Sequence, residues 1–396
     1  MEGRRSWLAR TMNPVRLMRF RWPAATNGAF VTIDTSRTMG TVPVSARIGG
    51  TTATGQLRGR CAVRGHDAGL PAGVSELVRS MAQAARLAPS IHNSQPWKFS
   101  ALPDGLAIHE DTTRSLPVVD PVGRLRAISC GAAVTNAALA VSMTGLRPVV
   151  DVRPSVDAPT LIATVVGTDL GRPDGAVPPQ DRRRYDAIPL RRSHRRLHDR
   201  SALRADEVDR LRAAVLGEGA RPVVPGATQR RQLGSVLREA VRHQLGDPAF
   251  VSEVGSWIRH PSDAGVADDG IPVASLGTAP YPADSLVHGD WDEDVVEDLP
   301  VEDELEASTI VGIATPGDLR GDWVIAGMAL ERLWLEATAL DLAVTFADQA
   351  TQWTASRDQA AEAVQAMGAL QVVLRVGRPL VDVPATPRRP LDELWM

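Results

Sequence analysis

The chain has 396 residues, 43% of them hydrophobic and 23% charged, which is ordinary for a globular protein and long enough for two domains. Residues 1–70 hold eleven arginines against three acidic residues, so this segment carries about +8 and the remainder about −11. The acidic remainder is a poor candidate for nucleic-acid binding, and the absence of any run of eighteen apolar residues predicts no membrane span.

Several common classes of site are excluded by motif. Cys61 and Cys130 form no CxxC pair, so neither a disulfide framework nor a zinc site is indicated, and a reduced, cytoplasmic setting is expected. The only lysine, Lys98, follows Gln-Pro-Trp, which excludes a Walker A phosphate loop. The chain also lacks a GxGxxG after a strand, a GxSxG elbow and an HExxH pair. Dinucleotide folds, α/β-hydrolases and zinc proteases of these types are therefore excluded.

Residues 1–70 show no sustained hydrophobic periodicity and are rich in Gly, Thr, Ser and Arg, which predicts a disordered basic extension. The folded part begins with a helix over about residues 74–88, whose apolar residues recur at i, i+3, i+4 and i+7. Pro89 ends this helix, because the residue before a proline is pushed out of the α region.

The segment after that helix, Arg86 to Phe99, reads RLAPSIHNSQPWKF. Short polar side chains here expose backbone N–H groups, and Pro96 then forces an extended backbone into a strand. A helix end, a donor-rich turn and an aromatic strand can form a wall for a flat polar ring. By spacing alone, a surface turn with one core tryptophan is the more common interpretation.

The rest of the first part predicts a hairpin, a helix and two strands. The hairpin joins residues 97–101 and 106–109 through a Pro-Asp-Gly turn. The helix, over about residues 124–144, is rich in small residues, so we expect a central helix that approaches its neighbours closely. The strands cover about residues 149–153 and 161–166.

A Pro/Gly-rich linker at residues 171–180 separates this part from the second. A basic cluster follows it, and the second part then predicts helices over 205–216, 229–245 and 323–340 and strands over 308–314, 343–346 and 371–376. Regular pattern fails over residues 262–306, whose second part is acidic, and an insertion of this length is typical of a lid, a binding loop or disorder.

An internal repeat links the two parts. The pattern around Gly131 matches that around Gly327 with a constant offset of 196, and each predicted helix leads to a strand that ends in Val-Gly. The repeat predicts two related α+β halves, residues 71–185 and 186–396, the second carrying the lid-like insertion 262–306.

The string from Ala88 to Trp97, APSIHNSQPW, resembles the flavin-contacting segment of the nitroreductase superfamily. The wider sequence, over about residues 75–395, resembles the Acg-type branch, in which one chain holds two nitroreductase-like halves. The resemblance implies an α+β fold in which each pseudo-symmetric half has a mixed or antiparallel sheet flanked by helices. It also implies non-covalent FMN and a monomer that is an internal pseudo-dimer.

The second part opens with Arg191-Arg192-Ser193-His194-Arg195. Guanidinium groups around a hydroxyl suit a phosphate dianion, although an arginine cluster alone is more often a solvated face. The cluster resembles the R-x-S-x-[RK] segment with which nitroreductases hold the FMN phosphate and ribityl chain. Residues 385–391 resemble the terminal basic segment of the family, which implies a further phosphate contact. The sequence leaves open whether Arg388 or Arg389 makes this contact. His194 and His198 are expected to be surface histidines rather than metal ligands.

The resemblance assigns cofactor contacts to residues of both parts. Because each motif occurs only once, we expect one composite site per chain. No metal site and no catalytic side chain are expected, because the flavin carries the chemistry. The predicted cofactor-binding residues are Arg86, Pro89, Ser90, Ile91, Asn93, Gln95, Trp97, Arg191, Ser193, Arg195, Arg388 and Arg389.

Two functions from different classes follow from the resemblance. In the first, the protein is an oxidoreductase that takes hydride from NADH or NADPH at flavin N5 and passes electrons to a nitroaromatic or quinone-type acceptor. In the second, the insertion 262–306 closes over the flavin and the protein stores or sequesters FMN without turnover. A flavin-free scaffold ranks third, because the ring motif and the phosphate motif occur together.

Overall fold

The computed structural model describes residues 75–152, 157–169, 175–196, 198–199, 201–260, 263, 267–275, 305 and 309–396, together with the backbone of four strands nearer the N-terminus. The chain divides into two compact units, Met1–Asp67 and Ala68–Met396. In the first unit the strands β1 (Met18–Arg21), β2 (Phe30–Ile33), β3 (Pro43–Ile48) and β4 (Thr51–Gln56) pair in that order. They lie within the segment predicted to be disordered, and the rest of that segment lies outside the described residues.

The second unit contains a first antiparallel sheet of four strands in the order β5-β6-β8-β7. The strands β5 (Trp97–Leu102) and β6 (Gly105–Glu110) form the predicted hairpin, with Leu102 paired to Gly105 at the turn. The other two strands are β7 (Arg147–Asp151) and β8 (Leu161–Thr168).

A second antiparallel sheet has the order β13-β14-β12-β9. It consists of β9 (Arg221–Val223), β12 (Thr309–Thr315), β13 (Ala343–Phe346) and β14 (Ala369–Gly377). Numbered along the chain within each sheet, both sheets have the order first, second, fourth, third. In addition, β7 begins at Arg147 and β13 at Ala343, which is the offset of the sequence repeat. The mixed or antiparallel α+β architecture predicted from the sequence is confirmed.

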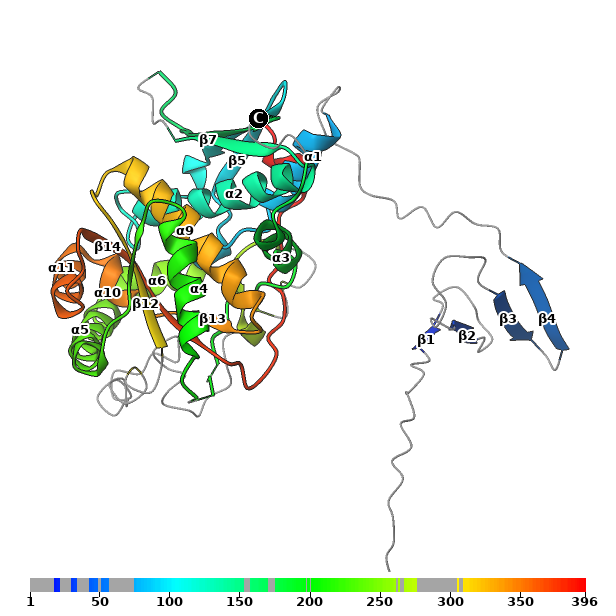
Figure 1. Ribbon diagram of the computed structural model, residues 1–396. Helices are drawn as coiled ribbons and strands as arrows, with labels where there is room; N and C mark the ends of the chain where they lie inside the picture. The colour runs from blue at the N-terminus through cyan, green and yellow to red at the C-terminus, as the bar shows by residue number, and fades with distance from the viewer. Residues whose placement is uncertain are drawn as a thin grey trace, which may run out of the picture. The chain divides into compact units, whose positions relative to one another are not determined.

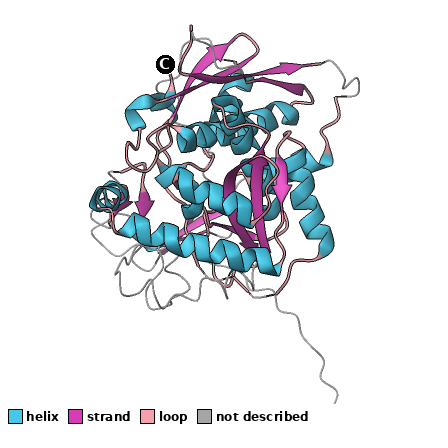
Figure 2. Cartoon of the chain, turned by 90° about the vertical axis from the view of Figure 1, so that its left-hand side faces the viewer, coloured by secondary structure: helices cyan, strands magenta, loops and turns pink. Residues whose placement is uncertain are grey.

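The predicted helices are present as α1 (Glu76–Ala85), α2 (Arg124–Met143), α4 (Ala205–Leu216), α5 (Ala227–Leu245) and α9 (Arg320–Thr338). The structure also contains helices that the sequence analysis does not predict: α3 (Pro179–Ala187), α6 (Pro248–Ser256), α10 (Gln349–Gln352) and α11 (Thr354–Ala363). Figure 1 shows the first sheet at the top of the second unit and β12, β13 and β14 in its lower part, and Figure 2 shows helices packed around the sheets.

The helices α2 and α9 cross at the two glycines of the repeat. A Cβ added to Gly131 would clash with the carbonyl oxygen of Val324, and one added to Gly327 would clash with the carbonyl oxygen of Ile128. The added Cβ at Gly131 would also lie 3.1 Å from the Cα of Gly327. Glycine at both positions therefore lets the two backbones touch, and the closely packed central helix predicted from the small residues is present.

Among the described helices, α2 is long and apolar enough to cross a membrane, but 94% of that stretch is buried inside the protein. It packs against α1, α9 and strands of the first sheet. Its apolar composition is thus accounted for by a position at the centre of the core.

Candidate functional site

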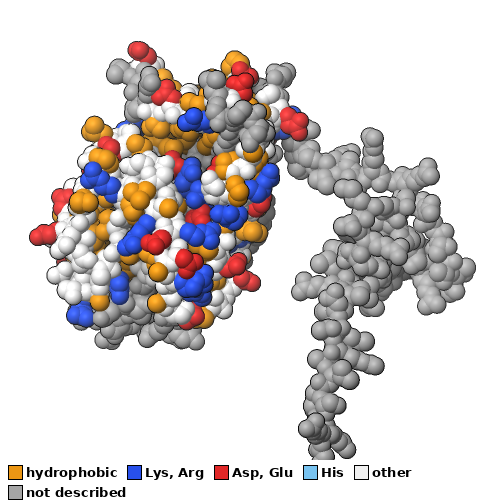
Figure 3. Space-filling model, in the orientation of Figure 1, with side chains coloured by type: hydrophobic (Ala, Val, Ile, Leu, Met, Phe, Trp, Pro, Cys, Tyr) orange, Lys and Arg blue, Asp and Glu red, His pale blue; other side chains and the backbone are white. Residues whose placement is uncertain are grey.

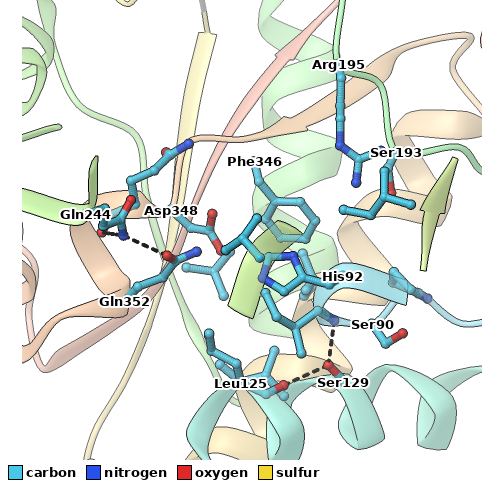
Figure 4. Close-up of a pocket in the computed structure, with 18 of the residues that line it drawn as sticks. Ser90, His92, Leu125, Ser129, Ser193, Arg195, Gln244, Phe346, Asp348 and Gln352 are labelled. Atoms are coloured by element: carbon cyan, nitrogen blue, oxygen red, sulfur yellow. Dashed lines mark hydrogen bonds between the residues drawn. The ribbon is translucent and has the colours of Figure 1, made fainter. Parts of the chain in front are cut away.

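The main cavity is built by segments that are spread along the sequence from Pro89 to Val372. It encloses about 1140 Å³ of empty space, counting the solvent at its mouth. Figure 4 shows Ser90 and His92, which follow α1, facing a space that is also lined by Ser193 and Arg195. Further walls come from α2, α9 and the residues after β13, so the cavity is lined by Pro89, Ser90, Ile91, His92, Leu125, Ile128, Ser129, Ser193, Arg195, Gln244, Phe250, Val254, Ile258, Ile271, Leu330, Phe346, Asp348, Gln349, Gln352 and Val372.

The loop after α1 has a strained backbone. His92, Asn93 and Gln95 have positive φ values of 47°, 54° and 48°, which non-glycine residues rarely adopt. The loop is held by the Ser90 hydroxyl, which accepts a hydrogen bond from Gln95 N at 2.9 Å, and by the Ser129 hydroxyl of α2, which accepts one from Ile91 N at 3.1 Å. Strain held in this way is typical of functional loops.

The side chains of Asn93 and Gln95 point away from the main cavity toward two other segments. Asn93 Nδ2 donates to the carbonyl oxygens of Gly270 and Pro387, each at 3.0 Å. Gln95 Nε2 donates to Asp268 O at 2.8 Å, and its Oε1 accepts from Arg389 N at 2.8 Å. The described residues 267–275 thus contact the loop, while residues 276–304 of the predicted lid lie outside the described part of the chain.

Arg86 and Trp97 do not line the main cavity either. Arg86 Nη1 donates to Arg389 O at 2.9 Å. Arg86 therefore also contacts the segment around Pro387 and Arg389, which we call the C-terminal segment. Trp97 is fully buried in the hydrophobic core of the first sheet.

The segment after α3 is fixed to the second sheet. Ser193 forms an isolated bridge with Val344 of β13, and His194 N donates to Val344 O at 3.1 Å. Ser193 lines the main cavity and also a smaller one, the arginine cavity, with an empty volume of about 410 Å³. The arginine cavity is lined by Leu87, Ile188, Pro189, Arg191, Arg192, Ser193, Pro384, Ala385, Thr386 and Arg388.

The arginine cavity has more buried positive than negative charge. Arg191 is 4% exposed, and its Nε lies 3.8 Å from Oε1 of Glu331, a fully buried residue of α9. Buried nitrogens of Arg191, Arg195 and Arg388 have no hydrogen-bond partner, and neither Glu331 oxygen has a well-formed hydrogen bond. A buried charge without a partner is costly, so this arrangement favours an anion.

The pKa shifts of the arginine cluster, which consists of Arg191, Arg195 and Arg388, agree with an excess of positive charge. Burial, reinforced by the charge of Arg191, lowers the pKa of Arg195 to about 10 and that of Arg388 to about 9. Burial raises the pKa of the Glu331 carboxyl to about 7, and Arg191 opposes that shift. The guanidinium groups therefore repel one another, and two carboxyls, Glu331 and Asp348, compensate them only in part.

The structure distinguishes the two arginines that the sequence left open. Arg388 lines the arginine cavity, and its Nη1 donates to Asn93 Oδ1 at 2.9 Å and to Thr386 Oγ1 at 2.6 Å. Arg389 instead lies 3.7 Å from Asp111 and 3.5 Å from Glu393. Arg388 is thus the member of the pair that joins the cluster.

The two histidines near this segment are buried, so the expectation that they lie on the surface is wrong. His194 is 3% and His198 9% exposed, and their ring centroids are 5.0 Å apart. His198 Nε2 and Thr345 Oγ1 are 3.0 Å apart, within hydrogen-bond distance. Packing of this segment against β13 covers both rings, which an i, i+4 spacing does not reveal.

Several cavity residues of the second part were not predicted. Gln244 and Phe250 come from α5 and α6, and Phe346 and Asp348 lie at and after the end of β13. Burial raises the pKa of the Asp348 carboxyl to about 6, with Arg124 and Arg195 opposing the shift. None of these residues stands in a recognisable motif, and only the tertiary fold brings them to the cavity.

Other arginines of the second unit, such as Arg184, Arg210 and Arg378, differ from Arg191 and its neighbours because they have close acidic partners. Figure 3 shows Lys and Arg side chains interspersed with Asp and Glu on one face of the second unit. Arg184 and Arg210 both pair with Glu336, at 2.7 Å and 2.6 Å, and Arg378 pairs with Glu207 at 2.9 Å.

Comparison with known proteins gives a consistent family. No family model matches the chain. Acg of Mycobacterium tuberculosis H37Rv, named as a candidate NAD(P)H nitroreductase, is 29% identical over 335 residues, covering 81% of this chain and 96% of that protein. Rv3131 of the same strain, named in the same way, is 30% identical over 325 residues, covering 81% of this chain and 91% of that protein.

A solved structure, a nitroreductase with bound FMN from Bacteroides fragilis, matches 51% of this chain and 93% of its own at 13% identity. Its TM-score of 0.32 is too low to carry an argument about the site. The sequence relatives, by contrast, are matched over almost their whole length. The chain therefore belongs to the Acg-type branch of the nitroreductase superfamily and is an oxidoreductase of the nitroreductase type.

Proposed function

We propose that the chain binds one non-covalent FMN and acts as an NAD(P)H-dependent oxidoreductase on a nitroaromatic or quinone-type acceptor. The observation that carries the proposal is the shared main cavity. Ser90 and Ile91 of the first motif face the same space as Ser193 and Arg195 of the second. Ser193 lines both that space and the arginine cavity.

The arginine cavity fits the FMN phosphate. A phosphate dianion would supply acceptors for the unpartnered nitrogens of Arg191 and Arg388, which line this cavity, and of Arg195, which lines the main cavity, and would offset their charge. Ser193, which lines both cavities, adds a hydroxyl. These four residues would hold the phosphate end of the cofactor.

The main cavity fits the ring system. Its walls are largely apolar, with Ile91, Leu125 and Phe346 among them, and a few polar groups such as Ser90 and Asp348 are placed between these. Cofactor sites commonly have this composition. Asn93, Gln95, Arg86 and Arg389 have a supporting role in this proposal, because their hydrogen bonds fix the loop and the C-terminal segment.

When bound, FMN supplies the redox chemistry, accepting hydride from NAD(P)H at N5 and returning electrons to the acceptor. The protein contributes orientation and electrostatics. The strained loop sets the position of Ser90 and Ile91, and the buried arginines anchor the cofactor by its phosphate. No catalytic side chain is required in this scheme.

We further infer that residues 71–185 and 186–396 are two nitroreductase-like halves joined in one chain. The same strand order in both sheets supports this division, as does the repeat offset of 196 between β7 and β13. The crossing of α2 and α9 at Gly131 and Gly327 would be the pseudo-twofold contact. One monomer would then contain the composite site that two subunits otherwise form.

The described part of the insertion favours a second candidate, an FMN storage protein. Asp268 and Gly270 accept hydrogen bonds from Gln95 and Asn93, and Ile271 lines the main cavity. A segment fastened in this way could cover the flavin and exclude NAD(P)H.

A stopped-flow experiment separates the two functions. The purified protein, reconstituted with FMN, is mixed anaerobically with NADPH or NADH while the flavin absorbance is followed. Loss of the oxidised spectrum within seconds supports the oxidoreductase. An oxidised spectrum that persists with either nucleotide, but disappears on addition of dithionite, supports storage. A protein that cannot be reconstituted with FMN would contradict both.

A further inference from the structure

A second cavity, the outer cavity, lies beside the main one, on the side away from Ser193 and Arg195. It has an empty volume of about 1260 Å³ and shares Gln244, Phe250 and Gln352 with the main cavity. Figure 4 shows the hydrogen-bonded pair of Gln244 and Gln352 at the opposite side of the main cavity from Ser193 and Arg195. A ligand in the outer cavity would therefore be separated from the main cavity by one pair of side-chain amides.

This amide pair is incompletely satisfied. Gln244 Nε2 donates to Gln352 Oε1 at 2.7 Å. Gln244 is 5% exposed, and its Oε1 is buried without a hydrogen-bond partner. An unpartnered buried amide oxygen costs free energy, and a ligand with an N–H or O–H donor would remove that cost.

The rim of the outer cavity offers flat apolar surface. The rings of His243 and Trp353 stack with centroids 4.2 Å apart and an interplanar angle of 19°. Trp353 remains 46% exposed, and Val122 at the same cavity is 70% exposed. Exposed aromatic surface of this kind suits stacking by a planar ring.

The charged groups of this lining already have partners. Arg357 pairs with Asp318 at 2.6 Å, and Arg124 donates to Gln371 O at 2.8 Å. Asp247 accepts from Ala249 N at 2.9 Å as the N-cap of α6. Because Arg357 is neutralised by Asp318 and Arg124 is held by a backbone carbonyl, the outer cavity suits an uncharged ligand and not a nicotinamide dinucleotide.

We propose that the outer cavity is a binding site for a neutral, planar aromatic molecule that carries an N–H or O–H donor. The molecule stacks on the face of Trp353 and donates to Gln244. Binding itself does not depend on the flavin. The further statement that this ligand is the electron acceptor, held in a vestibule next to the cofactor, rests on the proposed function.

The test uses two dyes that share a planar nitrophenyl ring, 4-nitroaniline and N,N-dimethyl-4-nitroaniline, of which only the first has N–H donors. Binding to the FMN-free and the FMN-loaded protein is measured by equilibrium dialysis, without any nicotinamide nucleotide. We expect 4-nitroaniline to bind about fivefold or more tightly than its dimethyl analogue in both forms, since a satisfied buried acceptor is worth about 1 kcal/mol.

Trp353→Ala should weaken 4-nitroaniline binding about fivefold or more, and Trp353→Phe should restore most of it. The control is Met367→Ala, a change at a residue that is 73% exposed and absent from the outer-cavity lining. Unchanged thermal unfolding and FMN affinity in the Trp353 variants would show that the loss is local.

Equal affinity for the two dyes, equal affinity in Trp353→Ala and Met367→Ala, or displacement of 4-nitroaniline by FMN would each overturn the proposal. The FMN-free arm keeps it separate from the proposed function. If the protein fails to bind FMN but distinguishes the dyes, the outer site stands and the flavin proposal falls. If the protein binds FMN but neither dye, the flavin proposal stands and the outer-cavity proposal falls.

Discussion

Arg191 shows at the scale of one residue how this site differs from a structural ion pair. Its guanidinium lies 4.7 Å from the ring centroid of Trp334 and 3.8 Å from Glu331, and it shares its surroundings with Arg195 and Arg388. In a stable ion pair the charges match, whereas here three guanidinium groups interact with two carboxyls, Glu331 and Asp348, whose pKa values are raised by burial. The excess positive charge is useful only if an anion binds.

Arg191→Ala is expected to weaken FMN binding by about 10- to 100-fold, because a charge-assisted contact to phosphate is lost. Riboflavin has no phosphate, so its affinity should change by less than about twofold under the same logic. Fluorescence titration with both flavins measures the two constants. Arg183→Ala, on the exposed side of α3, is the matched control. An equal loss of affinity for both flavins would contradict the phosphate role.

Glu331→Gln tests the carboxyl of the cluster. Burial raises the pKa of Glu331 to about 7 from an ordinary value near 4.5. Between these two pH values the carboxyl is protonated in the folded state and ionised in the unfolded state. The wild-type protein should therefore lose stability as pH rises from about 4.5 to 7, and the variant should lack this component. Urea unfolding of the FMN-free proteins should show the variant gaining on the order of 1–3 kcal/mol relative to wild type between pH 5 and pH 8. A pH-independent difference would show that Glu331 titrates normally.

Residue-level prediction from the sequence was strongest where a motif fixed the position. Ser90, Ile91, Ser193 and Arg195 were named from two strings and share a cavity. The choice between Arg388 and Arg389 needed the three-dimensional contacts. The two side chains are chemically identical, but that of Arg388 lines the arginine cavity and that of Arg389 lies near Asp111. Gln244 and Asp348 carry no motif, and the cavity they line exists only in the folded chain.

At the scale of elements, the contact between α2 and α9 depends on two glycines. Gly131→Ala and Gly327→Ala should each destabilise the protein by roughly 1–3 kcal/mol or more, because a methyl group would force the helix backbones apart. Gly321→Ala is the control in α9, the helix that also contains Gly327, since a Cβ there meets nothing within 4 Å. It should be neutral or stabilising by up to about 1 kcal/mol. Urea denaturation measures all three, and equal stability of the three variants would refute the close crossing.

Elements with an apolar stripe were predictable, and those without one were not. The helices α1 and α2 and the hairpin of β5 and β6 are close to their predicted bounds. The sequence of α3 is PQDRRRYDA, and its burial depends on the pair of Arg184 with Glu336 of α9. The helix α6 has no buried residue. Hydrophobic periodicity cannot detect helices that are stabilised by distant ion pairs or that lie on the surface.

At the scale of the whole molecule, the two sheets with one strand order support two related halves, and the single occurrence of each motif predicts one composite site per chain. We expect one FMN per chain and a monomer in solution. Native mass spectrometry of the reconstituted protein measures both the stoichiometry and the oligomeric state. Two flavins per chain, or flavin bound only by a dimer, would contradict the inference that the halves form an internal pseudo-dimer.

The contacts of the C-terminal segment have a consequence for biosynthesis. Arg388 bonds to Asn93 across 295 residues of sequence, and Met396 N donates to Phe99 O of the first sheet at 2.9 Å (Figure 1). Contacts between such distant residues form late, because a long stretch of chain must be ordered first. A nascent chain emerging from the ribosome could thus complete its first sheet early and still be unable to retain a nucleotide until Arg388 and the residues around it have been translated.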